Sequence, residues 1–160
     1  MTEIVARMET ILTTNTYVNA QGATVNFQTD IGTRVEEGRT NWDQNELPAI
    51  SIFQGTVTID REQSSDEDRV VCRVMPVMIQ CTFAQSDATA DTGTMVRKVL
   101  SDIHAAIRVD MKWSVAGVPQ ALRTDEISHG PEYKSETYEI IGTQTAIEIR
   151  YFAPHFSMED

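Results

Sequence analysis

The chain is poor in the residue types that bind metal ions, form disulfides or neutralise phosphates. Its 160 residues include two cysteines, three histidines and thirteen lysines and arginines, against twenty-four acidic residues, for a formal net charge of −11. Because phosphate binding depends on clustered Lys and Arg, this balance argues against a protein that wraps nucleic acid. Cys72 and Cys81 lie nine positions apart in one predicted strand, on opposite faces, so we expect two reduced cysteines that share neither a disulfide nor a metal ion.

Long hydrophobic runs are also lacking. No stretch approaches the ~18 to 20 consecutive apolar residues of a membrane-spanning helix. The segment after Met1 is amphipathic rather than uniformly apolar, so we expect no secretory signal, no membrane partner and a protein made in the cytosol. A chain of this length buries roughly 70% of its unfolded surface, which predicts a single domain over 1–160 that needs no metal or disulfide to fold.

Motifs for catalysis or cofactor binding are missing as well. His104, His129 and His155 fall in three different predicted elements, and none has a carboxylate or a second histidine at metal-ligand spacing beside it. The chain has neither a glycine-rich phosphate loop nor a nucleophile-elbow pattern. Adjacent acidic residues fall in hydrophilic segments, where we interpret them as solvated charge: Glu36 with Glu37, Asp66 with Glu67 and Asp68, and Asp125 with Glu126. We therefore expect no catalytic site, no metal site and no cofactor, and a protein that is not an enzyme.

The first third of the chain combines one helix with a turn-rich arm. Apolar residues at helical spacing predict an N-terminal helix over about 3–13. The arm, over about 15–46, is rich in Asn, Gln, Thr and Gly and contains weak strand candidates at 24–28 and around Arg34 and Val35. We expect this arm to be a loosely ordered hairpin or a surface extension.

Two short strands and an acidic loop come next. The apolar run at 49–53 follows a proline and predicts a compact strand, and a second strand is predicted at 56–59. Residues 60–69 contain no apolar side chain, so they cannot recover their ordering entropy through burial. We expect a solvated, mobile hairpin tip or loop at 60–69.

The segment 70–84 predicts the central strand. One of its faces is apolar and is made of alternate residues: Met75, Val77, Ile79, Cys81 and Phe83. Pro76 removes one hydrogen-bond donor from the strand, so we expect a bulge there or a change of partner strand.

The segments after this strand complete the predicted fold. An amphipathic helix is expected over about 88–109, starting near Asp87, with its apolar stripe on the sheet and with Asp102 among the residues that face solvent. A hairpin is predicted over 113–122, and a last strand over 137–152 alternates between an apolar face and a polar face that carries Glu148 and Arg150. The prediction is an α+β fold, in which a mixed or antiparallel sheet is packed by the helix at about 88–109 and joined by an N-terminal helix and a hairpin extension.

Four residues are candidate anchors for a partner protein. Trp42 and Trp113 are the two tryptophans, a residue type enriched at the centres of protein interfaces. Glu148 and Arg150 lie on the polar face of the last strand, which we interpret as a surface for water or for a polar partner.

The order of these elements resembles a known family. An N-terminal helix and a turn-rich arm precede the segment ELPAISIFQG, and a long strand then leads into the helix at about 88–108. The last strand alternates and ends in EIRY. Together these features resemble the tail-terminator (tail-completion) proteins of long-tailed bacteriophages, over most of the chain.

The resemblance implies a structural virion protein of the tail or neck, assembled in the host cytoplasm. Such a protein forms a homo-hexameric ring that caps the tail tube, terminates its polymerisation and provides the joining surface for the head. Its partners are then further copies of itself, the tail-tube protein and a head-completion or neck protein. DNA passes through such a ring without specific binding. Six copies of this chain carry a formal charge of −66, six times −11, so an acidic lumen would repel DNA phosphates. Acidity that only keeps the protein soluble explains the charge equally well.

The resemblance also places the acidic loop and the last strand. The loop would point into the lumen or towards the tube and become ordered on contact, while the polar face of the last strand and the edge of the helix would form the subunit interface. The charged candidates for this lumen or docking loop are Asp60, Arg61, Glu62, Asp66, Glu67, Asp68 and Arg69.

Other functions stay open at this point. Another phage neck, head-closure or tail-tube subunit would share the size, acidity and ring symmetry, but a tube subunit stacks into filaments whereas a terminator stops at one ring. A small soluble binding module or enzyme would need a concave pocket with convergent polar groups, of which the sequence gives no sign. The sequence leaves open whether the tail is contractile, which face meets the tube and whether the ring forms before it meets the tube.

Overall fold

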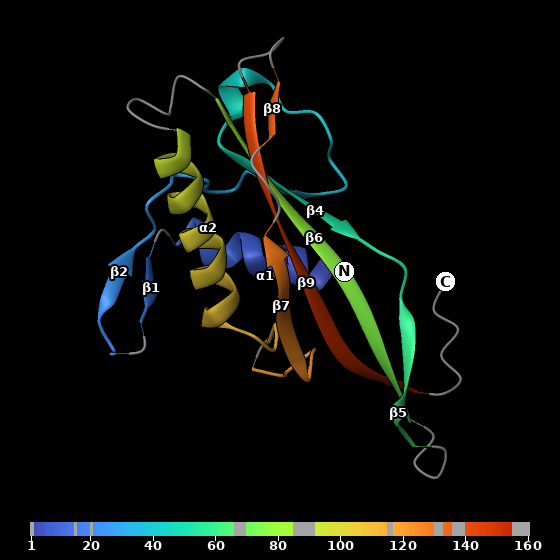
Figure 1. Ribbon diagram of the computed structural model, residues 1–160. Helices are drawn as coiled ribbons and strands as arrows, with labels where there is room; N and C mark the ends of the chain where they lie inside the picture. The colour runs from blue at the N-terminus through green and yellow to red at the C-terminus, as the bar shows by residue number, and fades with distance from the viewer. Residues whose placement is uncertain are drawn as a thin grey trace.

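The computed structural model describes residues 2–14, 16–19, 21–65, 70–84, 92–114, 117–129, 133–135 and 140–154 (Figure 1). Within them the protein is a mixed α+β fold with two α-helices and a mostly antiparallel sheet, as the sequence predicts. The predicted starts of the second helix and of the last strand, at 87–91 and 137–139, lie outside the described residues.

Two long antiparallel strands form the centre of the sheet. Strand β6 (Val70–Ala84) pairs with β9 (Ile140–Pro154) along its whole length, from Val70 opposite Pro154 to Ala84 opposite Ile140. In Figure 1 these two strands cross the molecule diagonally, and their ends beside β5 project beyond the helices. Alternating apolar residues in both strands fix this register, because a slip by one residue would turn every core side chain to the other face.

Shorter strands extend both edges of this pair. Next to β6 lie β4 (Ala49–Gln54) and β5 (Thr58–Ser65), and next to β9 lie β7 (Arg123–His129) and β8 (Tyr133–Ser135). Strand β3 (Val35–Glu37) adds to β4 in parallel.

A separate antiparallel pair is made of β1 (Thr16–Val18) and β2 (Thr24–Asn26). A short 3₁₀ helix, η1 (Gln44–Glu46), precedes β4. Figure 1 shows the β1–β2 pair beyond α2, away from the central strands.

The predicted change of partner at Pro76 is confirmed. Strand β4 pairs with β6 as far as Val77, and β5 takes over from Val74. Between them, the Gly55 N–H donates to the Pro76 carbonyl at 2.8 Å. A Cβ at Gly55 would lie only 3.2 Å from the Cβ of Pro76, so the close approach of the two strands favours glycine at this position.

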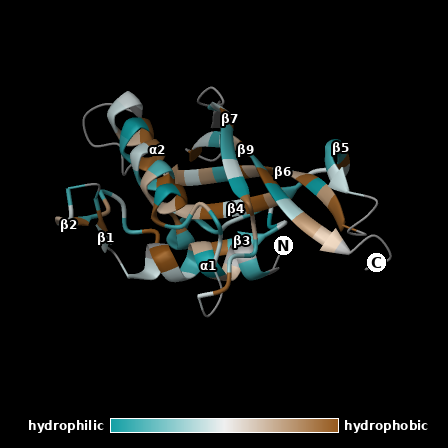
Figure 2. Cartoon of the chain, turned by 90° about the horizontal axis from the view of Figure 1, so that it is seen from below, coloured by the Kyte–Doolittle hydropathy of each residue, from teal (hydrophilic) through white to brown (hydrophobic). Residues whose placement is uncertain are grey.

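One continuous core lies on one face of the sheet. Helices α1 (Thr2–Thr13) and α2 (Thr92–Val109) both contribute to it, through Met8 and Ile11 and through Val99, Ile103 and Ile107. The predicted apolar face of β6 packs against them and is buried. Figure 2 shows hydrophobic residues along β4 and β6 and alternating hydrophobic and hydrophilic bands along α2.

The turn-rich arm contains the antiparallel pair β1–β2, in line with the expected hairpin, but its later part belongs to this core, which corrects the expectation of a loosely ordered segment or a surface extension. Phe27, Ile31 and Val35 are buried in the core cluster. The arm is also held by Asp102 of α2, which accepts hydrogen bonds from the backbone N–H groups of Gln28 (2.9 Å) and Thr29 (2.7 Å). Asp102 is 2% exposed, so the prediction that it faces solvent was wrong.

Two further differences concern strands. Strand β7 was not predicted, because Arg123–His129 contains a single large apolar residue, Ile127. The hairpin predicted over 113–122 does not appear among its described residues, where Gln120 and Ala121 both donate backbone hydrogen bonds to the Lys112 carbonyl.

Candidate functional site

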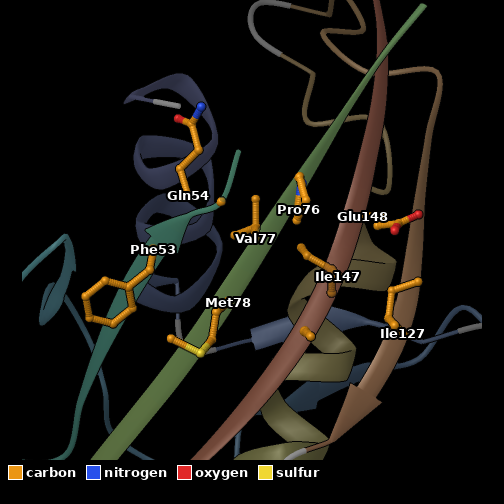
Figure 3. A pocket seen from close by; sticks show the side chains of 10 residues that line it. Phe53, Gln54, Pro76, Val77, Met78, Ile127, Ile147 and Glu148 are labelled. Atoms are coloured by element: carbon orange, nitrogen blue, oxygen red, sulfur yellow. The ribbon is translucent and has the colours of Figure 1, made fainter. Parts of the chain in front are cut away.

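The candidate site is the face of the sheet that lies opposite the core. Paired residues of antiparallel strands point to the same side, so Met78 shares this outer face with Ala146 and Phe53, and Glu148 shares it with Asp125. Among the described residues both helices lie on the other side, and Figure 3 views the outer face with the helices behind the sheet.

An open apolar hollow of about 310 Å³ lies in the middle of this face (Figure 3). Phe53 of β4, Met78 of β6 and Ile127 of β7 line it from three different strands, and Ile127 is 55% exposed. The hollow is at the small end for a pocket that would enclose a small molecule. Exposed apolar groups in an open hollow are more typical of a surface that packs against another protein.

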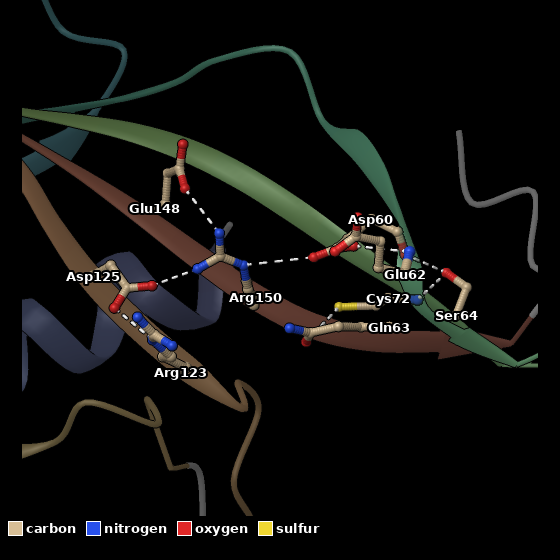
Figure 4. Close-up of polar contacts among 9 residues, drawn as sticks. All are labelled: Asp60, Glu62, Gln63, Ser64, Cys72, Arg123, Asp125, Glu148 and Arg150. Carbon is tan, nitrogen blue, oxygen red and sulfur yellow. Dashed lines mark hydrogen bonds and ion pairs between the residues drawn. The ribbon is translucent and has the colours of Figure 1, made fainter.

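Figure 4 shows a cluster of ion pairs centred on Arg150, which borders the hollow because Glu148 belongs to both. The Arg150 guanidinium donates to Asp125 and to Glu148, the latter at 3.3 Å, and Asp125 also accepts from Arg123 at 2.5 Å. The Nε of Arg150 makes no hydrogen bond to the part of the chain that the structure describes, and it lies 3.9 Å from the Asp60 carboxylate.

Among the described residues, the charge of this cluster is not balanced. Three carboxylates (Asp60, Asp125 and Glu148) face two guanidinium groups (Arg123 and Arg150). The side chain of Arg150 is 23% exposed, so the cluster borders solvent rather than lying in the core. A net negative charge beside an apolar hollow is complementary to a partner that carries an apolar group and a cation.

The structure places the four predicted anchor residues in different environments. Glu148 and Arg150 lie on the outer face as the alternation predicted, and both belong to the ion-pair cluster. Trp113 is 0% exposed and its indole N–H donates to Thr124 Oγ1 at 2.9 Å, so its prediction as a partner contact was wrong. Its apolar surface is used by the core instead.

Trp42 covers one end of the outer face. Its indole N–H donates to Ser51 Oγ at 2.8 Å, and the Arg39 guanidinium stacks 3.9 Å from its ring centroid. Trp42 packs with Leu47 and Ala49 in a small second cluster of buried residues. It is half-buried, so part of the indole remains accessible at the edge of the candidate site.

The predicted acidic loop is partly a strand. Asp60, Arg61 and Glu62 belong to β5, because Thr58–Ser65 pairs with β6 despite its polar sequence. The remaining candidates of this loop, Asp66, Glu67, Asp68 and Arg69, lie outside the described residues.

Both cysteines are buried and free, on opposite faces of β6, as predicted. Burial raises the pKa of both thiols; the nearby carboxylate of Asp102 adds to this for Cys81, and that of Asp60 for Cys72, where Arg150 opposes it. A raised pKa keeps the thiol protonated, so neither cysteine is suited to nucleophilic chemistry.

A second group of polar side chains lies on the core side of β7, at the edge of the sheet. His104 Nε2 of α2 lies 3.3 Å from His129 Nδ1 and 3.6 Å from Glu126 Oε2, and both of these belong to β7. Burial lowers the pKa of His104, and His129 and Arg108 lower it further while Glu126 opposes them. The neutral imidazole is therefore favoured near neutral pH.

Glu126 and His129 lie three positions apart in one strand, where regular alternation would place them on opposite faces, and His104 lies 22 and 25 positions before them on a helix. The prediction was that no carboxylate and no second histidine lies at metal-ligand spacing beside any of the three histidines. Histidine and carboxylate residues of separate elements meet only through the packing of α2 against the sheet. His155, the third histidine, lies outside the described residues.

Comparison with protein-family models and with curated proteins finds no match to this chain. Among the described helices, neither is long and apolar enough to cross a membrane.

Proposed function

We propose that this protein is a structural subunit that forms a ring on the end of a bacteriophage tail tube, terminates tube polymerisation and provides the joining surface for the head. The observation that carries the proposal is the outer face of the sheet. An apolar hollow and an acidic ion-pair cluster lie side by side on it, opposite the face on which both helices pack. A broad surface of this kind serves protein contact better than it serves catalysis.

The opposite side of the molecule offers the complementary charge. Helix α2 carries Arg97, Lys98 and Arg108 at exposed positions. The outer face of the sheet carries an excess of carboxylates around Arg150. A contact between the sheet face of one copy and the α2 face of the next is head-to-tail, and such contacts generate a closed ring when the rotation between copies closes.

The projecting end of the sheet supports a contact along the ring axis. Strand β5 and the adjoining ends of β6 and β9 extend beyond the helices (Figure 1). This end carries the charged residues Asp60, Arg61 and Glu62 of the predicted docking loop. In the proposed ring, it points into the lumen or towards the tail tube.

The first experiment is the solution mass by light scattering over a dilution series, with negative-stain images of the same fractions. Single six-fold rings with an open centre are the expected result. Stacked tubes would instead indicate a tail-tube subunit. A protein that stays monomeric at every concentration, and that neither binds nor shortens tubes of the tail-tube protein of the same phage, would contradict the proposal.

A matched pair of variants tests which surface is used. Ile127→Glu adds a carboxylate at the hollow, beside an existing excess of negative charge, and should shift the mass towards monomer. Val118→Glu makes a similar change at a residue that is 60% exposed, against 55% for Ile127, and that lies outside the hollow. Equal effects of the two variants on assembly would exclude the outer face as the specific interface.

A further inference from the structure

We propose that His104, Glu126 and His129 form a binding site for one divalent transition-metal ion, with zinc as the best match. Two imidazoles and one carboxylate provide three potential ligand atoms, and these atoms all lie within 4.8 Å of one another. The site lies on the core side of β7, whereas the hollow and the ion-pair cluster lie on the outer side. The inference does not depend on the proposed ring.

The distances fit the coordination of zinc. With metal–ligand bonds of about 2.0–2.1 Å, two ligand atoms of a tetrahedral zinc lie about 3.3 Å apart. The two nitrogen atoms of His104 and His129 are separated by 3.3 Å, and the His104 nitrogen and the Glu126 oxygen by 3.6 Å. The third pair, Glu126 with His129, lies within 4.8 Å, and the two imidazole rings are tilted by 44° with centroids 4.4 Å apart, so the His129 ring and the Glu126 side chain must both rotate to bring all three atoms around one ion.

A β-bulge in β7 creates this arrangement. Glu126 lies opposite Ile147 of β9, and Ser128 opposite Ala146, so the strand contains one extra residue between these pairs. In a regular strand, residues three positions apart point to opposite faces. The bulge restores Glu126 and His129 to the same face, on which His129 lies opposite Thr145, while Ile127 lines the outer hollow.

Helix α2 supplies the third ligand in a fixed position. Ile103 and Ile107 are 1% and 0% exposed and anchor the helix in the core. His104 follows Ile103 directly, so it lies at the border of this buried stripe, and its side chain is 26% exposed. The anchored helix thus fixes the backbone position of His104, while Glu126 and His129 of β7 are exposed and accessible to an ion from solvent.

The ligand types define the class of ion. Imidazole nitrogen favours zinc, copper, nickel and cobalt, whereas magnesium and calcium prefer oxygen ligands. Three protein ligands leave at least one coordination position for water.

The test uses the full chain after removal of metals with a chelator. Isothermal titration calorimetry with ZnCl₂ should show one ion per chain, and MgCl₂ should show no binding. The visible absorption spectrum of the Co²⁺-loaded protein should show the intense bands of a four- or five-coordinate site. Zinc should also raise the melting temperature, because an ion that binds only the folded state stabilises it.

Three variants locate the ion. His129→Gln and Glu126→Gln should each weaken zinc binding at least tenfold and remove the zinc-dependent rise in melting temperature. The matched control is Glu37→Gln, an exposed carboxyl on β3 at the opposite edge of the sheet, which should bind zinc like the unmodified protein. Circular dichroism of the metal-free variants checks that they are folded.

Two results would overturn the proposal. The first is the absence of saturable zinc binding by the unmodified protein, which would leave the three side chains as a hydrogen-bonded group. The second is zinc binding that His129→Gln and Glu126→Gln leave unchanged, which would place the ion elsewhere on the chain.

Discussion

The buried carboxylate of Asp102 provides the sharpest test of how the arm is attached to the core. Replacing Asp102 with Asn keeps the shape of the side chain but exchanges one acceptor oxygen for an NH₂ donor. The carboxylate accepts three hydrogen bonds, from the N–H of Gln28 at 2.9 Å and from the N–H and the hydroxyl of Thr29 at 2.7 and 2.5 Å. Whichever way the amide points, at least one backbone N–H, of Gln28 or of Thr29, then faces the NH₂ group.

The expected cost follows from these three bonds. A hydrogen bond to a charged group contributes about 1.5–3 kcal/mol, and a neutral one about 0.5–1.5 kcal/mol. Asp102→Asn loses one of these hydrogen bonds and weakens the other two, and the easier burial of a neutral group offsets part of this loss. We therefore expect the free energy of unfolding to fall by about 3 kcal/mol. With a urea m-value of about 2 kcal/mol/M, the unfolding midpoint should fall by about 1.5 M.

The assay is urea unfolding followed by circular dichroism, with Asp30→Asn as the control. Asp30 is an exposed carboxyl next to Thr29, so the same chemical change there should shift stability by less than about 0.5 kcal/mol. Thr29→Val removes only the hydroxyl bond and should cost about 1–2 kcal/mol. The double variant with Asp102→Asn should cost less than the sum of the two single changes, because both act on one bond. An Asp102→Asn variant that unfolds within 0.5 kcal/mol of the unmodified protein would refute the reasoning.

Two further predictions concern the core and the acid stability. Ile79→Asp places an unpaired carboxylate at a position that is 0% exposed in the centre of β6, so it should lower the free energy of unfolding by more than about 4 kcal/mol and abolish soluble expression. The control Ile59→Asp changes a residue that is 59% exposed and should express normally. Equal yields of the two variants would show that the core is misplaced. Burial alone would raise the pKa of Asp110, but hydrogen bonds from the Ser114 N–H and from Arg7 outweigh it, and the pKa falls below its ordinary value of 3.8. The stabilising contribution of Asp110 is therefore complete above pH 3.8 and is lost as the pH falls through the lower, folded-state pKa. Measured by chemical unfolding from pH 7 to pH 2, the stability difference between the unmodified protein and Asp110→Asn should be constant above about pH 5 and shrink in acid; a difference that does not change with pH would contradict this assignment.

Local sequence patterns were sufficient for the central elements. The two-residue alternation of β6 and β9 identified both strands and the faces of their side chains, and Pro76 marked the point at which β6 changes partner. These features follow from local geometry, because the direction of each side chain in a strand depends only on its position along that strand.

Sequence patterns misassigned the polar segments of the chain. Strand β7 and most of β5 lack the apolar alternation of a strand, yet the free backbone groups at the edges of β9 and β6 pair with them. Asp102 lies next to apolar residues of α2, and its charge alone suggests that it faces solvent. In the folded protein the arm, which is distant in the sequence, covers it. In each case a partner distant in the sequence satisfies the polar groups and makes burial favourable.

The sequence by itself thus determined the α+β class, the two helices, the central strand pair and the polar outer face that carries Glu148 and Arg150. Only the tertiary structure decided that Trp113 is buried, that Asp60 and Asp125 meet at Arg150, and that two histidines and Glu126 converge. The physical reason is the range of the interactions. Backbone periodicity acts between neighbours along the chain, whereas ion pairs and metal-ligand geometry act between side chains that become neighbours only after the helices and the sheet have packed.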